Sequence, residues 1–156
     1  RSAYARAKIV EEKILRLLCP SVAVLRYFNI VGKTATVNDY GSTNLFSIIG
    51  RNPKIKINSI SSTRDYVHVL DIARANVMAM EHLQTKGSFT TDIFTGESRT
   101  LLDVVHEYGQ NGHIVHYTVL GAEDASTIPT LDNRHIFGWE PAYTFQQAIR
   151  SEIKEK

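Results

Sequence analysis

Hydrophobic residues at positions 3–18 recur every three or four residues, which is the spacing of one face of an α-helix. The repeat ends before Pro20, a residue that cannot continue a helix. Positions 22–30 then form a short run of β-branched and aromatic residues that leads to Gly32, a pattern typical of a buried strand ending in a loop. The chain is therefore predicted to begin with a helix followed by a buried strand.

Helical and extended patterns keep alternating to the end of the chain. We expect, in order, a helix at 44–51, strands at 54–57 and 64–69, a helix at 70–83, a strand at 88–95, a helix at 101–108, an exposed strand at 113–120 and a helix at 145–153. Thr100 with Asp103, and Thr144 with Gln147, have the spacing of capping boxes at helix starts. The alternation predicts an α/β fold rather than a helix bundle or a β-sandwich.

Composition narrows the possible partners and location. With 156 residues, 43% of them hydrophobic and 22% charged, the chain has the profile of one ordinary globular domain. Its 18 basic and 16 acidic residues are scattered, so we expect no nucleic-acid partner. The single Cys19 cannot form an internal disulfide. No apolar run approaches the roughly 20 residues of a membrane span, and no signal-peptide pattern is present, so we expect a cytoplasmic protein without membrane contact.

The first helix contains a candidate catalytic pair. Tyr4 and Lys8 are four residues apart and therefore lie on one side of the helix, one turn from each other. An ammonium group beside a phenol favours the phenolate, which would let Tyr4 exchange a proton with a substrate hydroxyl near neutral pH. The spacing alone also fits an exposed face of a surface helix.

Two further positions are candidates for ligand binding. Arg64 follows turn residues at the start of a strand, where its guanidinium could grip a phosphate with two hydrogen bonds. The alternative is a structural ion pair between Arg64 and Asp65. Asn29 lies near the end of the strand predicted at 22–30, and ligands of open α/β sheets bind beyond the carboxyl ends of the strands. Its alternative role is that of a turn residue.

Other catalytic patterns are missing from the sequence. His113 and His116 are three apart in a predicted strand, so they would face opposite sides and make a poor metal pair; we expect no metal site. There is no G-x-S-x-G nucleophile elbow, no G-x-G-x-x-G turn and no P-loop. The chain therefore has no glycine-rich phosphate loop of its own.

Four motifs occur in a recognisable order. They are "YARAK-x-x-x-E" at 4–12, "LRYFN-x-x-G" at 25–32, "RDYVHV-x-D-x-A-x-A" at 64–75 and "GWEP" at 138–141. In this order the chain resembles the extended short-chain dehydrogenase/reductase family, which holds the NAD-dependent sugar-nucleotide epimerases and dehydratases. The second motif is most similar to the UDP-glucose 4-epimerase branch. The resemblance covers nearly the whole chain, but only the C-terminal half of the family.

The resemblance implies roles for three residues around an NAD cofactor. Tyr4 would be the active-site base, and Lys8 would hold the nicotinamide ribose and lower the pKa of Tyr4. Phe28 would lie against the cofactor. In the family's epimerases, NAD removes a hydride from C4 of the hexose, the 4-keto sugar turns over in the site, and the hydride returns to the other face.

The resemblance also implies a binding site for UDP-hexose or a related nucleotide sugar. Asn29 would bind the nucleotide sugar, Asn44 and Leu45 would touch its diphosphate and base, and Arg64 would clamp the diphosphate. Tyr66 would be a further neighbour of the nucleotide. Two stretches depart from the family pattern: "VLGAED" at 119–124 lacks a second arginine for the diphosphate, and "NSISST" at 58–63 lacks the usual glycines.

The implied domain, 1–156, is the C-terminal part of a Rossmann-like doubly wound sheet together with a small substrate-binding subdomain. The dinucleotide-binding half would precede Tyr4, so we expect the isolated chain to be inactive. The resemblance also implies that the full-length protein is a homodimer. Two alternatives stay open. The protein could be a nucleotide-sugar dehydratase or decarboxylase of the same family, or a non-catalytic relative that only binds the sugar nucleotide.

Overall fold

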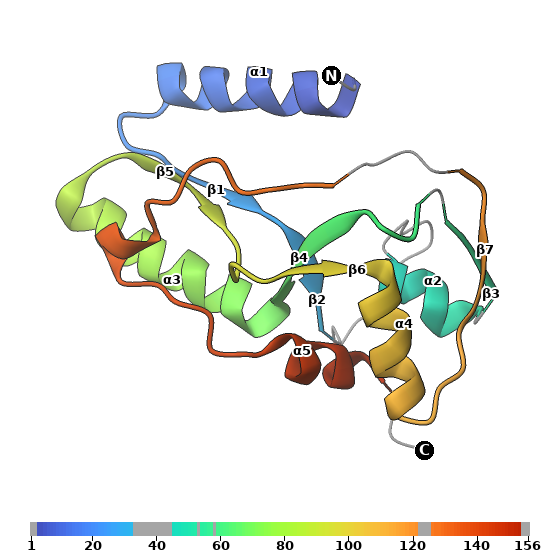
Figure 1. Cartoon of the computed structure of the whole chain (residues 1–156). Helices are drawn as coiled ribbons and strands as arrows, with labels where there is room; N and C mark the ends of the chain where they lie inside the picture. The colour runs from blue at the N-terminus through green and yellow to red at the C-terminus, as the bar shows by residue number, and fades with distance from the viewer. Residues whose placement is uncertain (1–2, 33–44, 53, 58, 122–125, 154–156) are drawn as a thin grey trace.

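The computed structural model describes residues 3–32, 45–52, 54–57, 59–121 and 126–153 (Figure 1). Helices and strands alternate, which confirms the predicted α/β class. The helices are α1 (Ala3–Leu18), α2 (Leu45–Arg51), α3 (Val69–Lys86), α4 (Leu101–Gln110) and α5 (Phe145–Glu152), with a 3-10 turn η1 (Arg134–Phe137). The strands are β1 (Ala23–Tyr27), β2 (Asn29–Val31), β3 (Lys54–Ile57), β4 (Thr63–His68), β5 (Phe89–Ile93), β6 (Ser98–Thr100) and β7 (His116–Val119).

The strands pair in three small sheets, mostly in parallel. β1 pairs with β5, β2 with β4, and β3 with β7, all in parallel, while β6 adds to β4 in the antiparallel direction. Parallel pairs need long crossover connections. The helix α3 lies on the connection from β1 to its partner β5, directly after β4. The strand predicted at 54–57 is observed as β3, in which exposed and buried residues alternate.

The segment 22–30 differs from its prediction as one buried strand. It is divided at Phe28 into β1 and β2, because β1 pairs with β5 whereas β2 pairs with β4. The backbone N–H of Phe28 still donates to the Ile93 carbonyl at 3.2 Å. Within the described residues β1 has one neighbouring strand, and its residues are half-buried or exposed. The prediction of a single, buried strand was therefore wrong.

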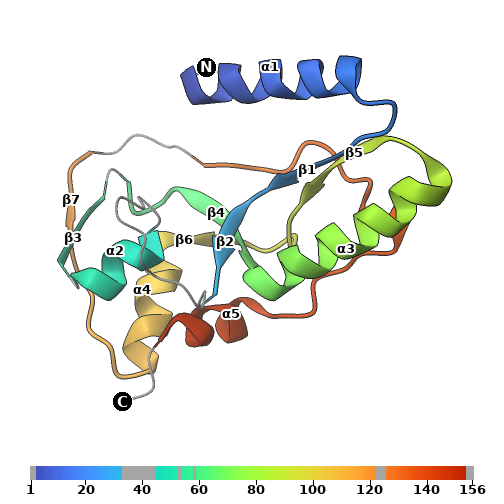
Figure 2. The same cartoon turned by 180° about the vertical axis from the view of Figure 1, so that it is seen from behind.

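Two hydrophobic clusters form the core. One lies between α3 and the β1–β5 pair and contains Ile93, Phe137 and Trp139; the other joins α2, β3, β4, α4 and α5. Both predicted capping boxes are present, at Thr100 for α4 and at Thr144 for α5. Figures 1 and 2 show α1 as a separate rod beyond β1 and β5, and it contributes no buried residue.

The "GWEP" motif attaches the last part of the chain to α3. The Trp139 ring is buried, and its Nε1–H donates to the Asp71 carbonyl at 3.0 Å. The Asp71 carboxylate accepts backbone N–H bonds from Ala142 and Tyr143, each at 3.1 Å. Gly138 adopts φ +70°, a conformation that favours glycine. The motif therefore has a structural role.

Candidate functional site

Tyr4 and Lys8 lie on the same side of α1, as their spacing predicts. The Lys8 Nζ is 5.8 Å from the centroid of the Tyr4 ring, and the Tyr4 side chain is 72% exposed. The Lys8 ammonium donates a hydrogen bond to Glu11 Oε2 at 2.7 Å. That hydrogen bond, followed by the attraction of the Glu11 charge, raises the pKa of Lys8. Lys8 therefore stays a cation next to the phenol while Glu11 is its hydrogen-bond acceptor.

A cavity of about 1400 Å³ opens between α1, β1 and α3. Tyr4, Lys8 and Phe28 all line it, together with residues of α3 such as Asn76 and Met80. The Asn76 side chain is held in place because its Oδ1 accepts a hydrogen bond from the Tyr27 hydroxyl at 2.8 Å. The three residues that the resemblance assigns to the cofactor thus share one cavity, although Tyr4 and Lys8 come from α1 and Phe28 from the link after β1.

Asn29 and Tyr66 are direct neighbours across the β2–β4 pair. Tyr66 is only 4% exposed, and its ring packs on Phe46 at 5.7 Å and on Phe145 at 5.8 Å between centroids. Burial raises the pKa of Tyr66 to about 12, so its phenol stays protonated at neutral pH. The structure therefore places Tyr66 in the core.

Arg64 is the second residue of β4 and is half-buried. Its Nη1 donates to the Thr63 carbonyl at 2.9 Å. The alternative of an Arg64–Asp65 ion pair is wrong in the described structure: Asp65 is buried and accepts bonds from Thr95 N, Thr95 Oγ1 and Gly96 N at 2.8–2.9 Å. Successive side chains of a strand point to opposite faces, which separates the two charges.

A second arginine lies beside Arg64. The two are register partners in the β4–β6 pair, so Arg99 and Arg64 share a face of the sheet. Arg99 donates to Glu97 at 2.8 Å and stacks over the Phe145 ring at 5.4 Å. Like charges opposite each other are unfavourable in a sheet, and the Glu97 carboxylate offsets the charge of Arg99 here.

The remaining predicted residues lie at the start of α2. Leu45 is the first residue of the helix and packs, half-buried, against the core cluster that contains Tyr66. Asn44 lies outside the described residues. Leu45, Arg64 and Tyr66 are not among the residues that line the cavity beside α1. The candidate site therefore has two parts, joined where Phe28 is followed by Asn29.

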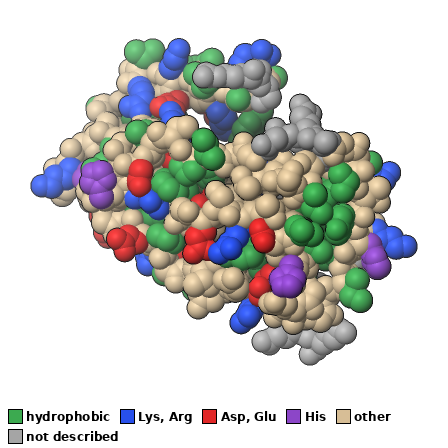
Figure 3. Space-filling model, in the orientation of Figure 1, with side chains coloured by type: hydrophobic (Ala, Val, Ile, Leu, Met, Phe, Trp, Pro, Cys, Tyr) green, Lys and Arg blue, Asp and Glu red, His purple; other side chains and the backbone are tan. Residues whose placement is uncertain are grey.

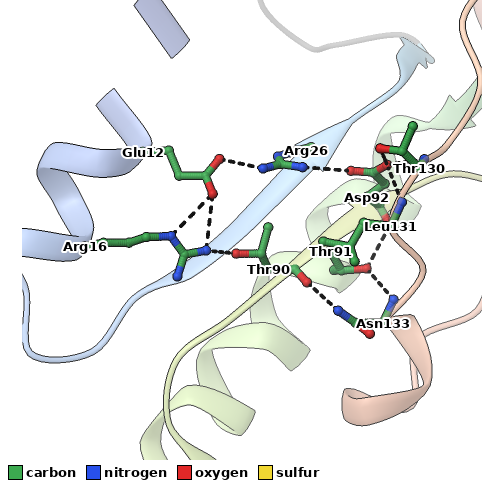
Figure 4. A network of polar contacts seen from close by, with 9 residues as sticks. All are labelled: Glu12, Arg16, Arg26, Thr90, Thr91, Asp92, Thr130, Leu131 and Asn133. Atoms are coloured by element: carbon green, nitrogen blue, oxygen red, sulfur yellow. Dashed lines mark hydrogen bonds and ion pairs between the residues drawn. The ribbon is translucent and has the colours of Figure 1, made fainter. Parts of the chain in front are cut away.

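A polar network that sequence reasoning missed connects α1 to the β1–β5 pair (Figure 4). Glu12 of α1 bonds Arg26 of β1 at 2.9 Å, and Arg26 in turn lies 3.9 Å from Asp92 of β5. Both Glu12 and Arg26 stand inside the quoted motifs, but neither spacing nor charge pattern indicates that they meet. Only the return of the chain through β1 brings them together.

The visible surface carries charges of both signs. Among the residues coloured in Figure 3, basic side chains are interspersed with acidic and hydrophobic ones. The described part of the chain contains no group of three or more His, Cys, Asp or Glu side chains that could hold a metal ion. No helix within the described ranges is long and apolar enough to cross a membrane.

Comparison with known proteins identifies relatives along the whole chain. The model of the NAD dependent epimerase/dehydratase family matches residues 1–91. The UDP-glucose 4-epimerase of Drosophila melanogaster is 30% identical over 145 residues, covering 76% of this chain and 41% of the relative. The UDP-glucose 4-epimerase of Rhizobium leguminosarum bv. trifolii is 29% identical over 174 residues, covering 95% of this chain and 53% of the relative. The chain thus spans about half the length of these relatives.

Solved structures confirm the Rossmann-like fold. A UDP-glucose-4-epimerase from Stenotrophomonas maltophila, crystallised with NAD and formylated UDP-arabinopyranose, superposes with a TM-score of 0.82 at 24% identity. The match covers 97% of this chain and 54% of that structure. A UDP-glucose 4-epimerase from Bifidobacterium longum, in complex with NAD+ and UDP, gives a TM-score of 0.77 at 23% identity, with 96% and 52% covered.

Proposed function

Because the chain belongs to the NAD-dependent epimerase/dehydratase family, we propose that it is the C-terminal part of a sugar-nucleotide 4-epimerase that interconverts UDP-glucose and UDP-galactose. The observation that carries this proposal is the cavity shared by Tyr4, Lys8 and Phe28. It places an exposed phenol, a fixed cation and an aromatic ring together, which is the set of groups that a nicotinamide and a sugar hydroxyl need.

In this proposal each residue has a defined task. Tyr4 exchanges a proton with the C4 hydroxyl of the hexose, while Lys8 holds the nicotinamide ribose and keeps a positive charge beside the phenol. Phe28 lines the cofactor side of the cavity. NAD, when bound, supplies the acceptor for the hydride. Arg64 binds the diphosphate, and Asn29 binds the sugar nucleotide where the two parts of the site meet.

The fit to NAD is partial within these 156 residues. The described residues offer contacts for the nicotinamide end through Tyr4, Lys8 and Phe28. The sequence holds no G-x-G-x-x-G turn, so we assign the dinucleotide pyrophosphate to none of its residues. We therefore propose that a dinucleotide-binding half completes the enzyme, that the 156 residues alone are inactive, and that the complete protein works as a homodimer.

The test is turnover by the polypeptide as its gene encodes it. Incubated with NAD and UDP-galactose, it is expected to form UDP-glucose, which NMR of the sugar protons detects directly. Tyr4→Phe is expected to lower kcat about a thousandfold, within the range of general acid–base catalysis. Tyr117→Phe, an exposed tyrosine of β7, is the matched control and should leave kcat unchanged. Equal rates for Tyr4→Phe and the parent would contradict the assigned role.

A second candidate function is supported by two observations. Lys8 is hydrogen-bonded to Glu11, and the stretch "VLGAED" offers no second arginine for the diphosphate. Both fit a non-catalytic relative that binds a sugar nucleotide. Calorimetry separates the two: heat from UDP without any turnover of UDP-galactose favours the binding protein. Loss of water from the sugar, detected as a 4-keto-6-deoxy product, would instead favour a dehydratase.

A further inference from the structure

The helix that carries Tyr4 and Lys8 is held by polar contacts rather than by a hydrophobic face. No residue of α1 is buried. Figure 4 shows instead a row of alternating charges that leads from the helix to the sheet. Glu12 accepts hydrogen bonds from Arg16 Nε at 3.3 Å and Arg16 Nη2 at 3.2 Å, and from Arg26 Nη2 at 2.9 Å. Arg16 also donates to the hydroxyl of Thr90 on β5.

The sheet end of this row is rigid. Asp92 is 3% exposed and is the register partner of Arg26 across the β1–β5 pair. Its Oδ2 accepts the backbone N–H groups of Thr130 at 2.8 Å and Leu131 at 3.1 Å, while its Oδ1 lies 3.9 Å from Arg26 Nη1. The Arg26 fork is therefore placed between a fixed carboxylate on the sheet and the Glu12 carboxylate on the helix.

Helix geometry relates this attachment to the candidate catalytic pair. Tyr4, Lys8 and Glu12 follow each other at intervals of four residues, so each lies one turn beyond the last on the same side of α1. Tyr4 and Lys8 line the cavity, and Glu12 and Arg26 line it as well. The contact between Glu12 and β1 thus fixes both the position of α1 relative to the sheet and the rotation of α1 about its axis, and with them the placement of Tyr4 and Lys8.

We propose that Glu12 and Arg26 are positioning residues, which hold Tyr4 and Lys8 at the correct place over the carboxyl end of β1. This inference rests on the proposed function, because it names the residues that align the proton-transfer group of the same site. Glu12 and Arg26 do not touch the reacting atoms in this scheme. They act through the placement of α1, and the nucleotide is held elsewhere by the β4 side of the site.

Because α1 and Arg64 belong to separate parts of the site, loss of the Glu12–Arg26 contact should lower kcat without changing KM. A misplacement of about 1 Å can cost about a hundredfold in rate. Glu12→Gln and Arg26→Met should each lower kcat by about tenfold to a hundredfold on that scale, whereas KM should stay within about twofold because Arg64 is untouched. The double variant should be no slower than the slower single variant, since both break one contact.

The experiment uses the polypeptide as its gene encodes it, with Lys13→Gln as the matched control. Lys13 is an exposed cation of α1 outside the cavity lining, so its replacement should leave kcat and KM unchanged. Amide hydrogen exchange gives the second readout. Residues of α1 should exchange about twofold faster in Glu12→Gln, the effect of a partly exposed ion pair, and those of α4 at the parental rate.

The two readouts keep the outcomes distinct. If kcat and the exchange of α1 are unchanged in both variants, the positioning role is wrong. If kcat and KM change together while α4 also exchanges faster, the pair serves general stability and the inference is equally overturned. If the parent protein shows no turnover, the proposed function fails, while faster exchange confined to α1 still supports the Glu12–Arg26 attachment.

Discussion

The two segments that carry the candidate site are anchored in different ways. In β4, the four residues from Asp65 to His68 are buried, and helices of this same chain pack on the strand through Tyr66 and Val67. The helix α1 has a regular apolar repeat, yet Val10 and Leu17 of this repeat are exposed, Leu17 by 84%. The β4 part of the candidate site is therefore built on a hydrophobic core, whereas the α1 part depends on ion pairs.

The contrast shows which structural features an apolar repeat can predict. A repeat at helical spacing indicates a helix with one face that can be covered, but it does not identify the covering surface. The opposite face of α1, which includes Ile9 and Glu12, is turned toward β1 and the cavity. Within the described residues, nothing covers the face of α1 that carries Val10 and Leu17.

The largest expected effect comes from breaking the core behind β4 and α3. Trp139→Ala removes a ring that is 1% exposed and its hydrogen bond to Asp71, so the free energy of unfolding should fall by about 3–5 kcal/mol. Leu17→Ala on α1 is the matched control and should change it by less than about 0.5 kcal/mol. Urea denaturation measures both. Similar losses in the two variants would show that α1 has a buried face after all.

A smaller effect is expected from Arg64, and it concerns binding rather than folding. Arg64→Lys keeps the charge of β4 but loses the planar fork, so the affinity for UDP should fall about tenfold, on the scale of one charge-assisted hydrogen bond. Titration calorimetry measures the change. Arg150→Lys replaces an exposed arginine of α5, keeps a cation within reach of its partner Glu107, and serves as control. An unchanged affinity in Arg64→Lys would remove Arg64 from the diphosphate site.

The sequence predicts those features that depend on neighbouring residues. The capping boxes at Thr100 and Thr144 and the side-by-side placement of Tyr4 and Lys8 follow from short spacings, and all three are confirmed. The division of 22–30 at Phe28 could not be predicted, because it depends on two partner strands that lie far along the chain. Local pattern carries no information about which strand will lie beside which.

One alternative at the site was wrong, and two contacts there could not be predicted. The Arg64–Asp65 ion pair was wrong because adjacent strand residues face opposite sides, a rule that the sequence alone could have supplied. The contact between Glu12 and Arg26 needs the chain to reverse after α1, so only the structure reveals it. The placement of Tyr66 in the core likewise depends on Phe46 and Phe145, which come from other elements.

The smallest expected effect is a pH dependence that distinguishes α1 from α4. The hydrogen bond from Arg26 is the main cause that lowers the pKa of Glu12, and the bonds from Thr100 lower the pKa of Asp103 in the α4 cap. A carboxylate with a lowered pKa in the folded state stabilises that state above its unfolded pKa, and the contribution is lost as the pH falls through the folded value. Both helices should therefore lose protection in the acidic range below the ordinary carboxylate pKa of about 4.

The variant Glu12→Gln separates the two contributions. Amide protection of α1, corrected for the intrinsic exchange rate at each pH, should no longer depend on pH in this range, while that of α4 should fall as in the parent because Asp103 is unchanged. The loss of protection that the parent shows in α1 and Glu12→Gln does not should correspond to about 0.5 kcal/mol, since Arg26 is partly exposed and such pairs are screened by water. If α1 of Glu12→Gln keeps the parental pH dependence, the Glu12–Arg26 pair does not hold the helix, and the contrast between a polar attachment and a buried core no longer stands.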